Sequence, residues 1–262
     1  MSGHLTLKVE KRVAVVSYHN PPVNATGGED YREFTELFSS LNRRMDISAV
    51  VLCTEGKGFM AGNDIRELKT HTPETHAESQ KKLADAFESI CQCRYPVIGA
   101  VQGYALGAGF VFAACCDMVV ASDDAYFALP EITLCVISGV GYALKMLPEC
   151  AARYLCMTGK PLNAQEMLQF GAINRVTARE KLMEEAMEIA DAIAALPPHA
   201  VIYMKELMNQ HCYHEHRRKF SLEDAYTGRL FGLPEKEEAV NAFLEKRRPV
   251  YEDGREKTLN GL

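Results

Sequence analysis

The chain has 262 residues, of which 47% are hydrophobic and 24% are charged, and its formal net charge is −6. This composition is typical of a globular protein with a sizeable core, built as one large domain or as one domain with an appendage. The acidic balance argues against nucleic acid or an anionic membrane as a partner, so any anion-binding site must be a local basic patch.

Alternating and helical spacings of apolar residues predict the elements of the first half of the chain. In chain order these are a hairpin at 5–9 and 13–16, a helix at 31–41, a strand at 49–53, a helix at 83–90 and strands at 97–101, 118–121 and 126–128. The uncharged run 95–116 is long enough for a membrane span. We interpret it as buried core, because Pro96 and several glycines interrupt it and no basic cluster flanks it.

Helical spacing dominates after about residue 140, at 164–170, 181–196, 200–210, 221–230 and 235–246. Strands that alternate with helices, followed by a helix-only tail, indicate an α/β fold. We expect a core of repeated β-β-α units over residues 1–195 and a helical C-terminal region over residues 196–262.

The cysteine pattern and the first residues bear on the compartment. The nine cysteines are odd in number and form no Cys-x-x-Cys pair, which predicts reduced thiols and no zinc finger. Met1 to His4 lack the basic and then apolar pattern of a secretory signal. We therefore expect a cytoplasmic protein. His211, His214 and His216 are interpreted as a solvated helix surface rather than a metal site, because His216 would point off the shared face.

The first of three segments that carry chemistry is Lys57-Gly-Phe-Met-Ala-Gly-Asn-Asp-Ile-Arg-Glu67, directly after the strand at 49–53. Gly62 would let the backbone approach a ligand closely, and a helix beginning near Asp64 would leave free N–H groups there. A plain surface turn explains the same residues equally well.

The second segment is Gly103-Tyr-Ala-Leu-Gly-Ala-Gly109, between the strand at 97–101 and the apolar run 110–116. A strand, a glycine-rich loop and a helix favour anion binding, because unpaired N–H groups and the helix dipole point the same way. With Asp123 and Asp124 downstream, the pattern also fits a dinucleotide-binding fold. Against that alternative, the loop lies far from the N-terminus and no Tyr-x-x-x-Lys occurs.

The third segment is Phe127-Ala-Leu-Pro-Glu131, in which Glu131 stands among the apolar neighbours Leu129, Ile132 and Leu134. Burial among such residues would raise the pKa of its carboxyl and make it a proton shuttle near neutral pH. The alternative is a solvent-facing glutamate at the end of a strand.

In order and spacing these segments resemble the crotonase (enoyl-CoA hydratase/isomerase) superfamily, over nearly the whole chain. Further matching motifs are Asn20-Pro-Pro-Val-Asn-Ala25, Cys116-Asp117, Gly171-Ala-Ile-Asn-Arg-Val176 and Glu245-Lys-Arg-Arg-Pro249. Each motif is weak alone, and their ordered combination is specific. The resemblance implies the crotonase (ClpP-like) fold with a helical C-terminal oligomerisation region, and a homotrimer or homohexamer. It also implies an acyl-CoA thioester substrate and no separate cofactor, because coenzyme A is part of the substrate.

Carried over position by position, the resemblance assigns the two oxyanion-hole donors to the backbone N–H groups of Asn63 and Ala108. It assigns the catalytic carboxylate to Glu131. The positions that it implies for coenzyme A are Ala25, Asp64, Ile65 and Arg66, with further basic contacts from Lys246 and Arg247. The other substrate-contacting positions that it implies are Met60, Ala61, Gly62, Gly107, Val111, Leu134 and Gly139.

One departure from the family bears on the reaction. Hydratases of the family use two glutamates, and Val111 stands where the second is expected. A valine can neither position water nor transfer a proton, whereas a single carboxylate suffices to move a proton from the α-carbon to C4. We therefore predict a Δ3–Δ2 enoyl-CoA isomerase. Cys135, Ser138 and Tyr142 also depart from the hydratase pattern, and Tyr142 would shorten the acyl pocket or supply a hydroxyl.

Three alternatives stay open. One is an enoyl-CoA hydratase or carnitinyl-CoA dehydratase-like lyase that recruits another acid, and the closing motifs look most like those of carnitinyl-CoA dehydratases. Another is an acyl-CoA decarboxylase or thioester hydrolase that uses the same oxyanion hole. The third is a non-catalytic acyl-CoA-binding protein.

Overall fold

A six-stranded sheet forms the centre of the computed structural model, which describes residues 3–64, 73–212, 223, 225–230 and 233–251. In spatial order its strands are β1 (Leu5–Glu10), β2 (Val13–Tyr18), β4 (Ala49–Thr54), β6 (Val97–Val101), β8 (Met118–Ser122) and β11 (Arg175–Thr177). The strands β1 and β2 form the predicted antiparallel hairpin, and the other neighbours are parallel. Because β4 and β6 are buried along their whole length, they read in the sequence as continuous apolar runs.

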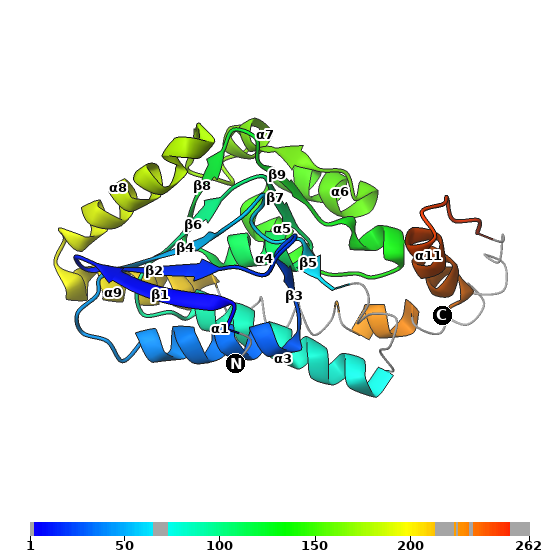
Figure 1. Ribbon diagram of the computed structural model, residues 1–262, viewed down its shortest axis with the longest axis horizontal. Coiled ribbons are helices and arrows are strands. Elements are labelled where there is room, and N and C mark those ends of the chain that lie inside the picture. Colours follow the sequence, from blue (N-terminus) through cyan, green and yellow to red (C-terminus); the bar gives the residue numbers. More distant parts are fainter. Residues whose placement is uncertain (1–2, 65–72, 213–222, 224, 231–232, 252–262) are drawn as a thin grey trace.

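Helices cover both faces of this sheet (Figure 1). On one face, α8 (Leu182–Ala194) presents Leu182, Ala186 and Ala190, which lie at four-residue spacing and pack against the sheet. On the other face lie α1 (Gly28–Leu41) and α3 (Pro73–Cys91), which bury Phe34 and Phe87 in the main core. The central strands are therefore shielded from water on both sides.

Short strands follow the core strands and bring the candidate site together. They are β3 (Ala25–Thr26), β5 (Gly62–Asn63), β7 (Tyr104–Leu106), β9 (Tyr126–Ala128) and β10 (Leu162–Asn163). In chain order, β2-β3-α1, β4-β5-α3 and β6-β7-α4 (α4, Ala108–Cys115) repeat the predicted β-β-α unit. One expectation was incomplete: the glycine-rich segment 103–109 is not all loop, because residues 104–106 pair with β9 as β7.

The second half contains η1 (Pro130–Leu134), α5 (Val140–Met146), α6 (Glu149–Thr158), α7 (Ala164–Gln169), η2 (Arg179–Lys181), α9 (Pro198–Cys212) and α11 (Pro234–Leu244). The expectation of a helix-only tail was wrong, because β10 and β11 also fall there and β11 joins the central sheet. Strands of two or three residues are too short to show alternation. Of the helix predicted at 221–230, residues 223 and 225–230 are described, and they are helical.

The uncharged run 95–116 forms β6, β7 and α4 in the protein core. In the described part of the chain, no helix combines the length and the apolar character that a bilayer crossing requires.

Candidate active site

Two glycine-containing segments from different β-β-α units lie side by side at the candidate site. The backbone N–H of Leu106 donates to the carbonyl of Met60 at 2.9 Å, which joins the segments. A Cβ atom built on Gly62 would lie 3.3 Å from the backbone nitrogen of Ala108 and 2.8 Å from the carbonyl oxygen of Leu106. Gly62 also has a positive φ of 85°. A residue with a side chain at this position would therefore strain the backbone and force its neighbours to move.

The amide of Ala108 is available to a ligand by its position in the fold. Ala108 is the first residue of α4, so its N–H has no acceptor within the helix, and the helix dipole adds positive potential there. The neighbouring Gly107 N–H is already used, because it donates to the carbonyl of Ala128 at 2.9 Å. The start of α4 therefore offers an N–H donor beside Gly62.

The second predicted donor, the amide of Asn63, is oriented by the short parallel pair β3–β5. The N–H of Asp64 donates to the carbonyl of Thr26 at 3.1 Å. Because successive N–H groups of a strand point to opposite sides, the N–H of Asn63 points away from β3. Its side chain is fixed as well, since Asn63 Oδ1 accepts a hydrogen bond from the hydroxyl of Tyr31. Sequence reasoning missed Tyr31, whose helical spacing indicates only a core residue.

Glu131 lies on η1 and faces the same segments. A Cβ atom at Gly107, whose φ is 56°, would collide with Oε1 of Glu131, so the carboxyl lies directly against the main chain at Gly107. Its Oε2 is buried and has no hydrogen-bond partner among the described residues. Burial, with a smaller contribution from the nearby Glu223 carboxylate, raises the pKa of Glu131 to about 7. A carboxyl of this kind exchanges protons readily near neutral pH.

Val111 and Gly139 form an apolar wall next to this carboxyl. Val111 is fully buried on α4. A Cβ atom built on Gly139 would lie 3.1 Å from Val111 Cγ2 and 2.8 Å from Leu129 Cδ2, so the three residues are in close contact. Leu134 is buried at the end of η1. The position expected for a second glutamate is thus an apolar contact point.

Tyr142, which the sequence placed in a possible acyl pocket, packs into the core. Its ring meets the ring of Phe87 edge-on, with centroids 5.6 Å apart. It is almost fully buried on α5. The ring therefore contributes to the packing of α5 on α3.

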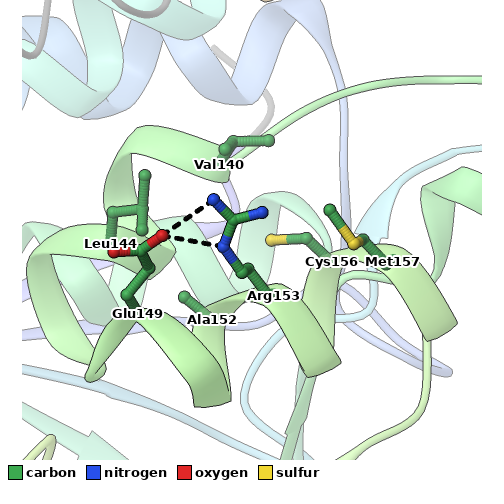
Figure 2. Close-up of a pocket in the computed structure, with 7 residues that line it drawn as sticks. All are labelled: Val140, Leu144, Glu149, Ala152, Arg153, Cys156 and Met157. Carbon is green, nitrogen blue, oxygen red and sulfur yellow. Dashed lines mark hydrogen bonds and ion pairs between the residues drawn. The ribbon is translucent and has the colours of Figure 1, made fainter.

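A cavity of about 340 Å³ lies between α5 and α6 (Figure 2). Its lining is mostly apolar, with an ion pair between Arg153 and Glu149, whose Nε and Oε1 atoms are 2.8 Å apart. Cys156 lines the cavity, and burial raises the pKa of its thiol to about 11, with smaller contributions from Glu223 and Glu131. Cys156 on the lining of this cavity is therefore near both carboxylates.

The residues expected to contact coenzyme A are only partly brought together. Ala25 pairs with Gly62 in the β3–β5 ladder, and Met60 and Ala61 lead into the same strand. Asp64 follows that strand directly, while Ile65 and Arg66 lie outside the described residues.

Polar side chains hold the chain at the start of β3. The carbonyl of Ala25 accepts hydrogen bonds from the Tyr18 hydroxyl at 2.7 Å and from Asn20 Nδ2 at 2.8 Å. Asn24 Nδ2 donates to the carbonyls of Glu55 and Gly58, at 2.8 and 2.9 Å, which ties β3 to the segment after β4. The motif at residues 20–25 therefore has a structural role that its pattern alone did not reveal.

Lys246 and Arg247 are not joined to this group within one chain. Both follow α11, which lies well to one side of β3 and β5 (Figure 1). The guanidinium of Arg247 is engaged by two carboxylates, with contacts of 2.6 Å to Glu238 and 2.6 Å to Glu245. The prediction that Lys246 and Arg247 give basic contacts to coenzyme A stays a prediction.

Only one of the three clustered histidines noted in the sequence lies among the described residues. His211 lies at the end of α9, whereas His214 and His216 lie outside the described residues. Within the described ranges, no three His, Cys, Asp or Glu side chains converge as metal ligands would.

Comparisons with known proteins agree with this arrangement. The family model for enoyl-CoA hydratase/isomerase matches residues 8–255. The chain is 31% identical over 238 residues to a (7aS)-7a-methyl-1,5-dioxo-2,3,5,6,7,7a-hexahydro-1H-indene-carboxyl-CoA hydrolase of Rhodococcus jostii, covering 90% of this chain and 92% of the relative. It is 30% identical to a short-chain-enoyl-CoA hydratase of Clostridium acetobutylicum, covering 94% and 96% of the two chains.

A solved enoyl-CoA hydratase/isomerase structure from Pseudoalteromonas atlantica matches the fold with a TM-score of 0.85 and 27% identity, covering 95% of this chain and 100% of that one. The chain belongs to the enoyl-CoA hydratase/isomerase family, within the crotonase superfamily.

Proposed function

We propose that the chain is a single-carboxylate enoyl-CoA isomerase. It moves the double bond of an enoyl-CoA thioester from between C3 and C4 to between C2 and C3. The observation that carries this proposal is the placement of one carboxyl, Glu131, against Gly107, with Val111 where a second acid would stand. An isomerisation moves one proton and consumes no water, so one carboxylate is enough.

In this mechanism the thioester oxygen accepts hydrogen bonds from the N–H groups of Asn63 and Ala108. Ionised Glu131 removes a proton from C2, and the electron pair moves into the enolate, whose negative oxygen the two donors stabilise. The enolate then collapses towards C4, which takes the proton back from Glu131 as the double bond forms between C2 and C3. A pKa of about 7 suits both transfers, because Glu131 acts first as base and then as acid.

Hydratase and hydrolase activities are the second candidates, because the relatives at about 30% identity carry those names. Both need an activated water. Among the residues that the structure describes, Glu223 is the carboxylate that raises the pKa of Glu131, but both of its oxygens accept backbone N–H bonds, from Val140 and Gly141. Such a carboxylate is poorly placed to activate water, which favours the isomerase.

The proposal is tested by giving the protein 3-enoyl-CoA and 2-enoyl-CoA thioesters of several chain lengths in separate reactions. We expect each to be converted into a mixture of the two at unchanged mass. A product heavier by one water would support a hydratase, and release of free coenzyme A would support a thioester hydrolase. The absence of any double-bond migration would rule out the isomerase.

We also propose that the region 196–262 mediates assembly into a homotrimer or a hexamer. The inner side of α9 is fixed to the core, because buried Lys205 contacts Asp117 at 2.6 Å. Its outer side exposes Tyr203, Met204, Leu207 and Met208, two of them by more than 60%. Exposed apolar clusters of this kind mark interaction surfaces. Light scattering on the purified chain should give a trimer or hexamer mass, and a monomer would contradict the proposal.

A further inference from the structure

Two buried side chains of the C-terminal region hold the segment that follows Glu131. Thr227 Oγ1 accepts the N–H of Ile137 at 3.0 Å and donates to the carbonyl of the same residue at 2.8 Å. Glu223 accepts the N–H of Gly141 at 2.7 Å and the N–H of Val140 at 3.3 Å. Four hydrogen bonds thus join the C-terminal region to residues 137–141.

These bonds satisfy groups that would otherwise be buried without partners. Val140 and Gly141 are the first residues of α5, so their N–H groups have no acceptor within the helix. A carboxylate is stabilised at such a helix start by the dipole and by the N–H groups, which offsets its burial. Thr227 and Glu223 are themselves 1% and 8% exposed. Side chains this buried form a fixed contact rather than a surface ion pair.

The segment that they hold is continuous with the candidate site. The N–H of Val136 donates to the carbonyl of Glu131 at 3.1 Å, so the segment is tied to the carboxyl-bearing η1. Gly139, between the two held positions, packs on Val111 and Leu129 in the apolar wall. A displacement of this segment would therefore move both Glu131 and the wall of the acyl pocket.

We propose that Glu223 and Thr227 are positioning residues that act from the C-terminal region to fix Glu131 and Gly139 in their working geometry. The proposal rests on the function proposed above, in which Glu131 transfers the proton. It makes the helical C-terminal region part of the active site, in addition to any role in assembly. Neither side chain needs to touch the substrate.

Two pairs of variants separate positioning from a direct role. Thr227→Val removes both hydroxyl bonds at nearly constant shape, whereas Thr227→Ser keeps them. Glu223→Ala removes both carboxylate bonds, whereas Glu223→Gln keeps one acceptor oxygen for Gly141. Glu184→Gln, at an exposed position on α8, is the matched control for loss of a carboxylate.

We expect Thr227→Val and Glu223→Ala to lower kcat about 10- to 100-fold, which is the range that a small misplacement of a catalytic group costs. The affinity for free coenzyme A, measured by calorimetry, should stay unchanged. Thr227→Ser should retain activity within about threefold, and Glu223→Gln should fall between the wild type and Glu223→Ala. Loss of coenzyme A affinity together with kcat would overturn the proposal, because it would indicate general damage to the fold.

Hydrogen exchange supplies a readout that does not depend on the reaction. Amides of residues 135–146 should exchange faster in Thr227→Val and Glu223→Ala, and at the wild-type rate in Glu184→Gln and Thr227→Ser. Unchanged exchange in the first two variants would refute the positioning role, even if the isomerase activity stands. Faster exchange in a protein that shows no double-bond migration would instead refute the proposed function and leave the positioning contact intact. A Glu223→Gln loss as deep as that of Glu131→Gln, with normal exchange, would assign Glu223 a direct role and overturn the proposal.

Discussion

The two walls of the candidate site are built in different ways. The proposed oxyanion wall consists of main-chain amides at β5 and the start of α4, which the β-β-α units join to the central sheet. The acid–base wall consists of the Glu131 side chain and residues 135–141, and it is held by side chains from the C-terminal region. The first wall depends on backbone geometry, and the second depends on a few side-chain contacts.

This difference teaches which substitutions each wall tolerates. Residues that provide only an amide can change identity, so Asn63 and Ala108 are compatible with an oxyanion hole whatever their side chains. At the acid–base wall, the reaction depends on which side chains are present, because Val111, which packs on Gly139 of this wall, cannot replace a glutamate. The reaction is therefore expected to vary at this wall while the oxyanion wall stays the same.

The largest effect is expected for Glu131→Gln, which removes the only acid–base group of the proposed mechanism. The rate kcat should fall by about 10² to 10⁴, the usual contribution of general acid–base catalysis. Affinity for an acyl-CoA product should stay the same, because the amide donors remain. Steady-state kinetics and calorimetry measure the two quantities, with Glu184→Gln as control. Activity within tenfold of the wild type would show that the acid–base wall is assigned to the wrong residue.

Gly62→Ala tests the oxyanion wall. Its Cβ atom would lie 2.8 Å from the carbonyl oxygen of Leu106 and 3.3 Å from the nitrogen of Ala108, so the two amides must separate. We expect kcat to fall by about 10² to 10³, as for loss of one oxyanion donor. Gly28→Ala is the matched control, because a Cβ atom there has no neighbour within 4 Å. Equal kinetics in the two variants would argue against an oxyanion hole at these segments.

The pH dependence of kcat/KM distinguishes the two walls, because the titrating group, Glu131, lies on the acid–base wall. Ionised Glu131 is the base, so kcat/KM should rise with pH, reach half its maximum near pH 7 and then level off. Other titratable groups near it are Glu223 and Cys156 of α6. The helix α11 packs on η1 and places Glu235 and Lys236 near Cys135 at the end of η1. A profile that is flat from pH 5 to 9 would contradict the assignment.

The raised pKa of Glu131 also predicts that the stability of the fold falls with rising pH, whereas kcat/KM rises. Glu131 keeps its proton up to about pH 7 in the folded protein, and releases it at its ordinary value of 4.5 when unfolded. Stability is therefore lost as pH rises through this window, by an amount on the order of 3 kcal/mol. Glu131→Gln lacks this loss, so it should gain stability relative to the wild type between pH 4.5 and 8 in urea unfolding. A gain that does not grow with pH would refute the raised pKa.

The smallest effect is expected for Tyr31→Phe. The change removes the hydroxyl that bonds Asn63 Oδ1 and keeps the ring, which stacks on Phe112. The same hydroxyl also bonds Thr26 Oγ1 at 3.0 Å, so the variant loses two hydrogen bonds. Loss of the bond to Asn63 costs about 1 to 2 kcal/mol, so kcat should fall about 5- to 30-fold if that bond orients the Asn63 amide. A stability loss of that size without a kinetic effect would limit Tyr31 to a structural role.

Much of the fold could be predicted from the sequence, because its signals are periodic. The hairpin, the buried strands β4 and β6 and the helices α1 and α8 follow the apolar spacing directly. The short strands β3, β5 and β11 could not be predicted in this way, because two or three residues carry no period. Their pairing depends on contacts between distant parts of the chain.

Some residues of the candidate site could be predicted from the sequence, and others could not. The glycines at 62 and 107 and the apolar setting of Glu131 are visible locally, and the structure brings these segments together. Tyr31, Glu223 and Thr227 gave no local signal, because each acts on a residue far away in the sequence. Contacts of this kind are defined only once the C-terminal region is folded against the core.

Deuterium exchange at the α-carbon tests the central claim most directly. A saturated acyl-CoA, which has no double bond to move or hydrate, is incubated with the protein in D₂O and followed by mass spectrometry. If two amides hold an enolate beside Glu131, the wild type should introduce deuterium at C2, and both Glu131→Gln and Gly62→Ala should lose this activity. No exchange in the wild type, or exchange that survives in Glu131→Gln, would contradict the account.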